Sequence, residues 1–293
     1  GANTTVTSVG ATATITVPTG TAGTFSYDLV SVQDASATAC SQVQVGNGTV
    51  VVNPLPTATI AGDITLCVND VAPTITFTGA NGSAPYTFTY TINGGASSTV
   101  TSVGVTATVT APTGTAGAFM YDLVSVQDAS ATGCSQAQVG SATIIVNPLP
   151  TATIVGDISL CLGEPDPTIT FTGANGTAPY TFTYNVDGGP NVTITSVGTT
   201  ATVASPAGVA GTFVYTLVSV QDASATGCSQ AQAGTATVIV TPLPIATIAG
   251  TVILCVNDPS PTITFTGANG IAPYTFTYNI NGGANTTVTS VGT

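Results

Sequence analysis

Residues 74–92 read TITFTGANGSAPYTFTYTI, and this stretch decides the fold. Threonine alternates with apolar residues over 74–78 and again over 86–92. A period of two is typical of a β-strand with one buried face. The segment 79–82, Gly-Ala-Asn-Gly, predicts a turn between the two strands, and Asn-Gly-Gly at 93–95 predicts a hairpin turn after the second. The stretch therefore predicts two short strands separated by a tight turn.

The same pattern recurs along the chain with a period of 94 residues, which the motif Pro-Leu-Pro at 54–56, 148–150 and 242–244 marks. Residues 1–10 are identical to residues 283–292, three periods later. We therefore divide the chain into the C-terminal part of a repeat (1–53), two complete repeats (54–147 and 148–241) and the N-terminal part of another (242–293). Because both ends fall at the same point of a repeat, we expect the chain to be a window on a longer array. A repeat of this length is too long for a solenoid unit and suits an independent small domain.

Each repeat carries several further strand patterns, near 99–110, 118–126 and 137–146, with 57–67 as a broken first strand. About seven short strands with turns every 8–12 residues predict an all-β, immunoglobulin-like antiparallel sandwich. No segment has a period of 3.6 residues, so we expect no helix.

The charge composition excludes whole classes of function. The chain of 293 residues has no Lys, Arg or His and 12 Asp plus Glu, for a net charge of −12. Binding to a nucleic-acid backbone requires cationic side chains, so a nucleic-acid partner is excluded. Without imidazole or lysine most acid–base and Schiff-base chemistry is unavailable, and we expect no enzyme. No apolar run reaches the roughly 18 residues of a spanning helix, so we expect no membrane insertion of this segment.

The six cysteines fall two to a repeat, and the chain has neither histidine nor a Cys-x-x-Cys pair for a zinc site. Disulfides in an oxidising, extracellular compartment are the natural interpretation. One pairing stays within repeats and joins Cys67 to Cys134 and Cys161 to Cys228, which suits a self-contained domain. The other crosses the linkers and would join successive domains into a stiff rod; its pairs are Cys40–Cys67, Cys134–Cys161 and Cys228–Cys255.

The Pro-Leu-Pro motifs lie between the last strand of one repeat and the first strand of the next. Two prolines in three residues favour an extended path, so we expect semi-rigid spacers that set the same rotation at every step. The linker residues are Pro54, Pro56, Pro148, Pro150, Pro242 and Pro244.

Acidic residues near the cysteines are the only candidate metal ligands. A disulfide could gather carboxylates into a Ca²⁺ site, although loop aspartates more often cap turns. The candidates are Asp70, Asp128, Glu164 and Asp222. We expect no other cofactor.

Tyrosines are the candidate ligand-binding aromatics. Tyr27, Tyr121 and Tyr215 sit in the pattern Phe-x-Tyr-x-Leu, where we expect a core position or a tyrosine corner. Tyr86 and Tyr90 could form a platform for sugars, but they alternate with Phe88 on one face, which predicts core packing.

The combined pattern resembles the PKD-like repeats of very large Bacteroidetes surface proteins. It comprises PTITFTGANG-x-APYTFTY, then Asn-Gly-Gly, then LVSVQDASATGCSQ. Similar repeats occur in gliding-motility adhesins of the SprB kind, which are exported by type IX secretion. The resemblance covers the whole chain and implies an Ig-like fold, a cell-surface location and a role as a filament shaft in adhesion or gliding.

Three functions remain open from the sequence. The first is a structural stalk that holds an adhesive tip away from the cell, with neighbouring repeats as its partners. The second is an array of weak carbohydrate or calcium sites that acts by avidity on surface glycans. The third is a filament or sheath in which copies of the chain pair laterally.

Overall fold

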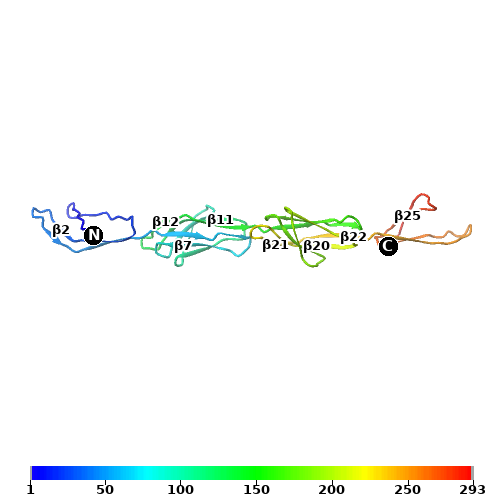
Figure 1. The fold of residues 1–293 in the computed structure, drawn as a ribbon, viewed down its shortest axis with the longest axis horizontal. Helices are drawn as coiled ribbons and strands as arrows, with labels where there is room; N and C mark the ends of the chain where they lie inside the picture. Colours follow the sequence, from blue (N-terminus) through cyan, green and yellow to red (C-terminus); the bar gives the residue numbers. More distant parts are fainter. Residues whose placement is uncertain (1, 292–293) are drawn as a thin grey trace. The chain divides into compact units, whose positions relative to one another are not determined.

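The structure is a computed structural model that describes residues 2–291; Gly1, Gly292 and Thr293, which belong to the outer part-repeats, lie outside the described residues. The chain divides into two compact units, Gly1–Val146 and Asn147–Thr293. Figure 1 shows their strands coloured along the sequence. To within one residue, each unit holds one complete repeat and one part-repeat, and the repeat boundaries themselves stay a prediction.

The fold is all-β, as predicted, and no described residue is helical. Accordingly, the described residues contain no helix that could cross a membrane. Each complete repeat has nine strands rather than about seven, because the segments expected at 57–67 and 99–110 each form two strands and a three-residue strand follows the long one. In the first repeat they are β5 (Thr57–Ala61), β6 (Ile64–Cys67), β7 (Thr74–Ala80), β8 (Thr87–Ile92), β9 (Ser98–Thr101), β10 (Thr106–Thr110), β11 (Gly117–Gln127), β12 (Ser135–Ala137) and β13 (Ser141–Asn147). In the second they are β14 (Thr151–Val155), β15 (Ile158–Cys161), β16 (Thr168–Ala174), β17 (Thr181–Val186), β18 (Val192–Thr195), β19 (Thr200–Ala204), β20 (Gly211–Gln221), β21 (Ser229–Ala231) and β22 (Thr235–Thr241).

The strands of a complete repeat form two sheets. In the first repeat, a three-stranded sheet has the order β10–β7–β5, and a six-stranded sheet has the order β6–β13–β11–β8–β9, with β12 paired to β11. The second repeat has the same two sheets. The sandwich is antiparallel, as predicted, apart from the pairing of the first strand's second half with the last strand: β15 pairs with β22 in parallel, with Cys161 opposite Thr241.

The parallel pair exists because the first strand crosses from one sheet to the other. Gly62, between β5 and β6, has φ of 140°, a conformation that side chains with a Cβ rarely adopt. A Cβ added at Gly62 would also lie 2.9 Å from the carbonyl oxygen of Thr74. Glycine at this position lets the chain bend, so the second half of the strand joins the sheet that contains β13.

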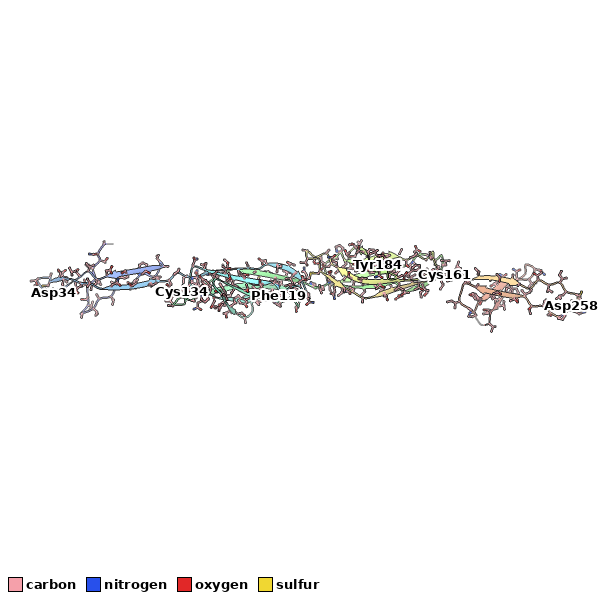
Figure 2. The ribbon with its side chains drawn as sticks, turned by 90° about the horizontal axis from the view of Figure 1, so that it is seen from below. Asp34, Phe119, Cys134, Cys161, Tyr184 and Asp258 are labelled. Carbon is pink, nitrogen blue, oxygen red and sulfur yellow. The ribbon has the colours of Figure 1, made fainter. Side chains whose placement is uncertain are left out.

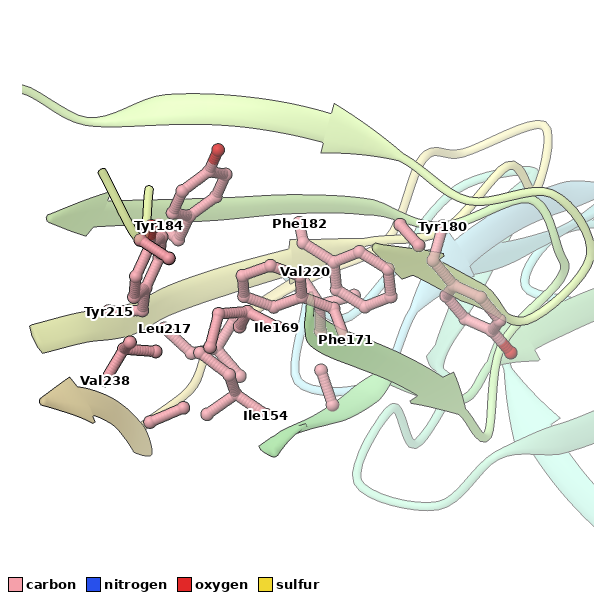
Figure 3. Packing of buried hydrophobic residues seen from close by; sticks show 14 of the residues in the cluster. Ile154, Ile169, Phe171, Tyr180, Phe182, Tyr184, Tyr215, Leu217, Val220 and Val238 are labelled. Carbon is pink, nitrogen blue, oxygen red and sulfur yellow. The ribbon is translucent and has the colours of Figure 1, made fainter. Parts of the chain in front are cut away.

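The alternation that predicts the strands also selects the core. Ile75, Phe77 and Phe88 are fully buried, and the rings of Phe77 and Phe88 stack with centroids 5.6 Å apart. Each buried side chain of this size contributes about 1.5–3 kcal/mol through the hydrophobic effect. Figure 3 shows the equivalent cluster of the second repeat, in which Phe171 and Phe182 repeat the same stack. The alternate threonines face away from this core.

The part-repeats are made of two-stranded ladders with mostly exposed side chains. β1 (Gly23–Asp28) pairs with β4 (Asn47–Val52), β2 (Ser31–Gln33) with β3 (Ser41–Val43), β23 (Ile245–Ala249) with β24 (Thr264–Ala268), and β25 (Thr275–Tyr278) with β26 (Thr286–Thr289). Phe265 and Phe276 still stack at 5.6 Å, the distance found in both complete repeats. The local strand and aromatic geometry is therefore already established in half a repeat.

Candidate functional site: the two ends of a repeat

The candidate functional residues gather at the two ends of each complete repeat. The entry end contains the start of β5 and the loops 81–86 and 128–134. Thr57 pairs with Ala80, and Asn81 Nδ2 donates a hydrogen bond of 3.1 Å to Thr57 Oγ1. The exit end contains the ends of β6 and β13 in the first repeat, and of β15 and β22 in the second.

Asp128 closes the entry end. Its side chain is only 5% exposed. One carboxylate oxygen, Oδ2, accepts a hydrogen bond from Ser83 N at 3.1 Å, and the other, Oδ1, accepts bonds from Ser130 N at 3.2 Å and Ser130 Oγ at 2.7 Å. Asp222 makes the equivalent bonds to Thr177 and Ser224 in the second repeat. These carboxylates cap turns and hold two loops together.

The electrostatics of Asp128 agree with this structural role. Burial by itself raises the pKa of the carboxyl, but the hydrogen bonds from Ser130, Ser83 and the Cys134 backbone outweigh it, so the pKa of Asp128 is lowered from its usual 3.8. In the part-repeat 1–53, a side-chain hydrogen bond from Ser36 lowers the pKa of Asp34 in the same loop. Asp128 is ionised at neutral pH and already supplied with donors.

The calcium hypothesis depended on Asp128 and Asp70 meeting, and the structure separates them. Asp70 lies at the exit end, where its Oδ2 accepts a hydrogen bond of 2.8 Å from Cys67 N. Glu164 occupies the Asp70 position of the second repeat, and Asp222 occupies the Asp128 position, so they are separated in the same way. Within residues 2–291, no three His, Cys, Asp or Glu side chains gather where they could hold a metal ion.

The tyrosines serve the core and the entry end. Tyr121 and Tyr215 are 1% and 3% exposed, as a core position predicts. Burial, and secondarily the neighbouring Tyr90, raises the pKa of Tyr121. Tyr86 and Tyr90 are buried as well, so the prediction of core packing for them is confirmed.

Tyr86 has a second role that its sequence context did not predict. Its hydroxyl donates to Gly82 O at 2.9 Å and accepts from Gly82 N at 3.1 Å, which fixes the loop 81–86. Its own backbone N donates to the buried Ser102 Oγ at 2.6 Å. Ser102 was missed, although the repeated Ser-Val-Gly at 8–10, 102–104, 196–198 and 290–292 is a signal that could have found it.

The residue before each of the first two Pro-Leu-Pro linkers is hydrogen-bonded to the entry end of the complete repeat that follows. Asn53 Nδ2 donates a hydrogen bond of 3.0 Å to Thr132 Oγ1, in the loop that Asp128 closes. Asn147 makes the same 3.0 Å bond to Thr226. Pro56 and Pro150 are buried, whereas Pro54 and Pro148 are exposed. Semi-rigid spacing by Pro54, Pro56, Pro148, Pro150, Pro242 and Pro244 stays a prediction, and the asparagine contacts give it a physical basis.

The cysteines do not form either predicted set of disulfides. Cys67 and Cys228 are disulfide-bonded, whereas Cys40, Cys134, Cys161 and Cys255 are free thiols. The within-repeat pairs Cys67–Cys134 and Cys161–Cys228 are therefore wrong. The cross-linker pairs Cys40–Cys67, Cys134–Cys161 and Cys228–Cys255 are wrong as well.

The physical reason is the length of the sandwich. In the second repeat, Cys161 lies near the start of β20. Its neighbour Leu160 pairs with Val240, and Val240 pairs with Gly211, the first residue of β20. Cys228 precedes β21, which pairs with the far end of β20 at Gln221. From one end of β20 to the other the strand rises about 33 Å, at about 3.3 Å per residue. A disulfide requires Cα atoms within about 7 Å. Figure 2 marks Cys161 near one end of this repeat and, in the first repeat, Cys134 and Phe119 toward opposite ends.

One apolar groove lies in the second unit. It has a volume of about 850 Å³ and is lined by Phe265, Phe276 and Tyr278, among others. Their counterparts in the second repeat, Phe171, Phe182 and Tyr184, are packed against side chains of β20 and β22. The groove is therefore lined by residues whose counterparts form the core of the second repeat.

Comparisons with known proteins assign the chain to no family. No family model matches the chain, and no curated protein matches it. Among solved structures, a Ca²⁺-stabilized adhesin that helps an Antarctic bacterium reach out and bind ice is 18% identical, over 91% of this chain and 70% of that chain, with a TM-score of 0.42. The fibronectin(III)-like modules of CbhA from Clostridium thermocellum are 14% identical, over 64% of this chain and 95% of that chain, with a TM-score of 0.28. The BSP domain of a biofilm-associated protein is 17% identical, over 64% of this chain and 29% of that chain, with a TM-score of 0.21. Since all three similarities are distant, the sandwich assignment rests on the strand order described above.

Proposed function

We propose that this chain is a segment of the stalk of a large, repetitive cell-surface adhesin, located outside the cell. Its task is to carry an adhesive or motility function away from the surface. Its partners are the neighbouring repeats of the same polypeptide. On this proposal it is not an enzyme, and it requires neither a cofactor nor a nucleic-acid or membrane partner.

The observation that carries the proposal is the repeated joint. The residue before Pro-Leu-Pro is hydrogen-bonded to the entry end of the following sandwich in the same way at Asn53 and at Asn147. Meanwhile, the residues that could have formed a binding site have structural roles: Asp128 and Asp222 close loops, and Tyr86 and Tyr90 are buried. Residues that maintain spacing and packing, and that recur from one repeat to the next, suit a shaft; the third linker has Thr241 in place of the asparagine.

The finer assignment belongs to the same proposal. The likeness of the repeats to those of giant Bacteroidetes surface proteins suggests a gliding-motility filament exported by type IX secretion. A bacterial adhesin and a biofilm-associated protein among the distant structural neighbours are compatible with a surface adhesin.

The proposal is tested by ligand binding and electron microscopy of the intact chain. Titration calorimetry with Ca²⁺ and a glycan array should detect no saturable binding, and EDTA should leave the melting temperature within about 1 °C. Micrographs should show separate particles whose length increases by a constant amount when repeats are added.

Two other results would replace the stalk with a different function. Uptake of Ca²⁺ or a glycan in proportion to the number of repeats would establish a binding array. Lateral bundles of the chain at micromolar concentration would establish a self-assembling sheath.

A further inference from the structure

Three Asn-Gly dipeptides lie in the second unit, at 175–176, 269–270 and 281–282. An asparagine side chain reacts most readily with its own backbone when glycine follows it, because glycine places no Cβ beside the attacking nitrogen. Whether such a dipeptide reacts in a folded chain depends on how firmly the glycine nitrogen and the asparagine amide are held. The structure holds the three dipeptides differently.

The first two dipeptides are each locked by a tyrosine. Gly176 N donates a hydrogen bond of 3.1 Å to the Tyr180 hydroxyl, which in turn donates to Gly176 O at 2.8 Å. Gly270 makes the same two bonds to Tyr274, at 3.0 Å through its N and 2.8 Å through its O. The Asn175 amide is held as well, because its Nδ2 donates at 3.1 Å to a threonine hydroxyl of β14. In both turns the attacking nitrogen is therefore fixed in place.

The third dipeptide is open. It lies in the exposed turn between β25 and β26, with φ of 53° at Asn281 and 73° at Gly282. No other part of the chain lies within 4 Å of a Cβ added at Gly282. Gly282 N donates at 3.2 Å to Oδ1 of Asn279, itself an exposed side chain. Among the described residues, the Asn281 side chain has no hydrogen-bond partner.

The equivalent turn of the second repeat shows that a carboxylate fits at this position. Asp187 occupies the place of Asn281, with φ of 52°, and the same two glycines follow it. Both turns close with a backbone hydrogen bond to the carbonyl three residues earlier, at 2.9 Å from Gly189 N and 3.0 Å from Gly283 N. An aspartate at position 281 is therefore compatible with the hairpin.

We propose that Asn281 is a site of spontaneous deamidation, which converts it to the residue type that Asp187 already provides. Gly282 N attacks Cγ of Asn281 and loses its proton; the bond from Cγ to Nδ2 breaks, and Nδ2 leaves as ammonia. Water then opens the resulting cyclic imide at either carbonyl and yields aspartate or isoaspartate. Water is the only co-reactant. Each conversion adds a negative charge at an exposed turn, whether or not the chain serves as a stalk.

The test is a time course on the folded, full-length chain in mildly alkaline buffer, followed by a protease that cleaves before Asp. Asn269 and Asn281 share the peptide 258–293 of the unmodified chain. Aspartate formed at 281 creates a new cleavage site and releases 281–293. Isoaspartate leaves the peptide uncut but heavier by the difference between an amide and a carboxylic acid, and fragment spectra assign its position.

We expect conversion at Asn281 to be at least about tenfold faster than at Asn269 and Asn175, where hydrogen bonds must break before the attack. Asn175 is followed in its own peptide, 166–186. Equal rates at the three sites of the folded chain, or no conversion at Asn281, would overturn the proposal.

Two controls separate the effect of the structure from that of the sequence. In denaturant the tyrosine hydrogen bonds are lost, so the three rates should converge. Tyr274→Phe removes the hydroxyl that holds Gly270 and should raise the rate at Asn269 without changing the rate at Asn281. A rate at Asn269 that does not respond to Tyr274→Phe, or a difference between sites that persists in denaturant, would assign the selectivity to the neighbouring sequence and contradict the structural basis of the proposal.

Discussion

Asn53 Nδ2 lies 3.0 Å from Thr132 Oγ1, so the last residue before one Pro-Leu-Pro linker is fixed to the loop that closes the next sandwich. The same contact recurs between Asn147 and Thr226. A hydrogen bond of this kind contributes about 0.5–1.5 kcal/mol, which is too little to hold a fold together but enough to restrict a short hinge.

The double variant Asn53→Ala and Asn147→Ala should therefore loosen the joints without unfolding the repeats. We expect a broader distribution of bend angles at the linkers in electron micrographs and a melting temperature within about 2 °C of the parent. Asn191→Ala, which removes an exposed hydrogen bond to Asn185 within one repeat, is the matched control and should leave the distribution unchanged. An unchanged distribution in the double variant would mean that the prolines alone set the joint.

Asp128→Asn should destabilise the first repeat by about 1–3 kcal/mol at pH 7. Both carboxylate oxygens of Asp128 accept from N–H donors, and an amide would direct its own donor at one of them. Denaturant unfolding at pH 7 measures the effect. Asp122→Asn, in the adjoining strand β11, is the control and should change stability by less than about 0.5 kcal/mol.

The same residue predicts a pH dependence. The pKa of Asp128 is lowered in the folded chain from its usual 3.8, so its contribution to stability is present above about pH 4 and is lost as the pH falls through the lowered value. The difference in stability between wild type and Asp128→Asn should thus shrink below about pH 4. A difference that stays constant from pH 7 to pH 2.5 would assign the effect of the variant to packing instead.

Gly79→Ala should destabilise the first repeat by about 1–3 kcal/mol, because an added Cβ would lie 2.5 Å from Cγ of the Tyr86 ring. Tyr86 cannot retreat, since its hydroxyl is bound to Gly82 on both its donor and its acceptor side. Gly114→Ala is the control, because nothing lies within 4 Å of the new Cβ. Equal melting temperatures for the two variants would show that the ring moves freely.

Most of the fold was predictable from local pattern. The alternation over 74–78 and 86–92 identified two strands and placed Phe77 and Phe88 in the core, as the structure confirms. Even so, the turn between them does not join partners in a ladder: β7 and β8 belong to different sheets. A turn signal reports that the chain reverses, not which strand it pairs with afterwards.

The arrangement of residues at the two ends of a repeat was not predictable from the sequence, because it depends on the direction in which each strand runs in the folded domain. The broken first strand over 57–67 was foreseen, but not that its second half would run parallel to the last strand, as β15 does beside β22. This orientation places Cys161 at the exit end of its repeat, far from Cys228 at the entry end. Neither predicted set of cysteine pairs fits that arrangement. The carboxylates of the calcium hypothesis lie apart for the same reason, because the loop after Cys67, with Asp70, and the loop before Cys134, with Asp128, are at opposite ends of the repeat.

The parallel pairing at the exit end of a repeat has a mechanical consequence. β15 and β22 run in the same direction, so a force applied to the two ends of the second repeat pulls these strands past each other in shear. The backbone hydrogen bonds between them are then loaded at the same time and must break together. Strands that are peeled apart from one end lose their hydrogen bonds one after another and separate at a lower force.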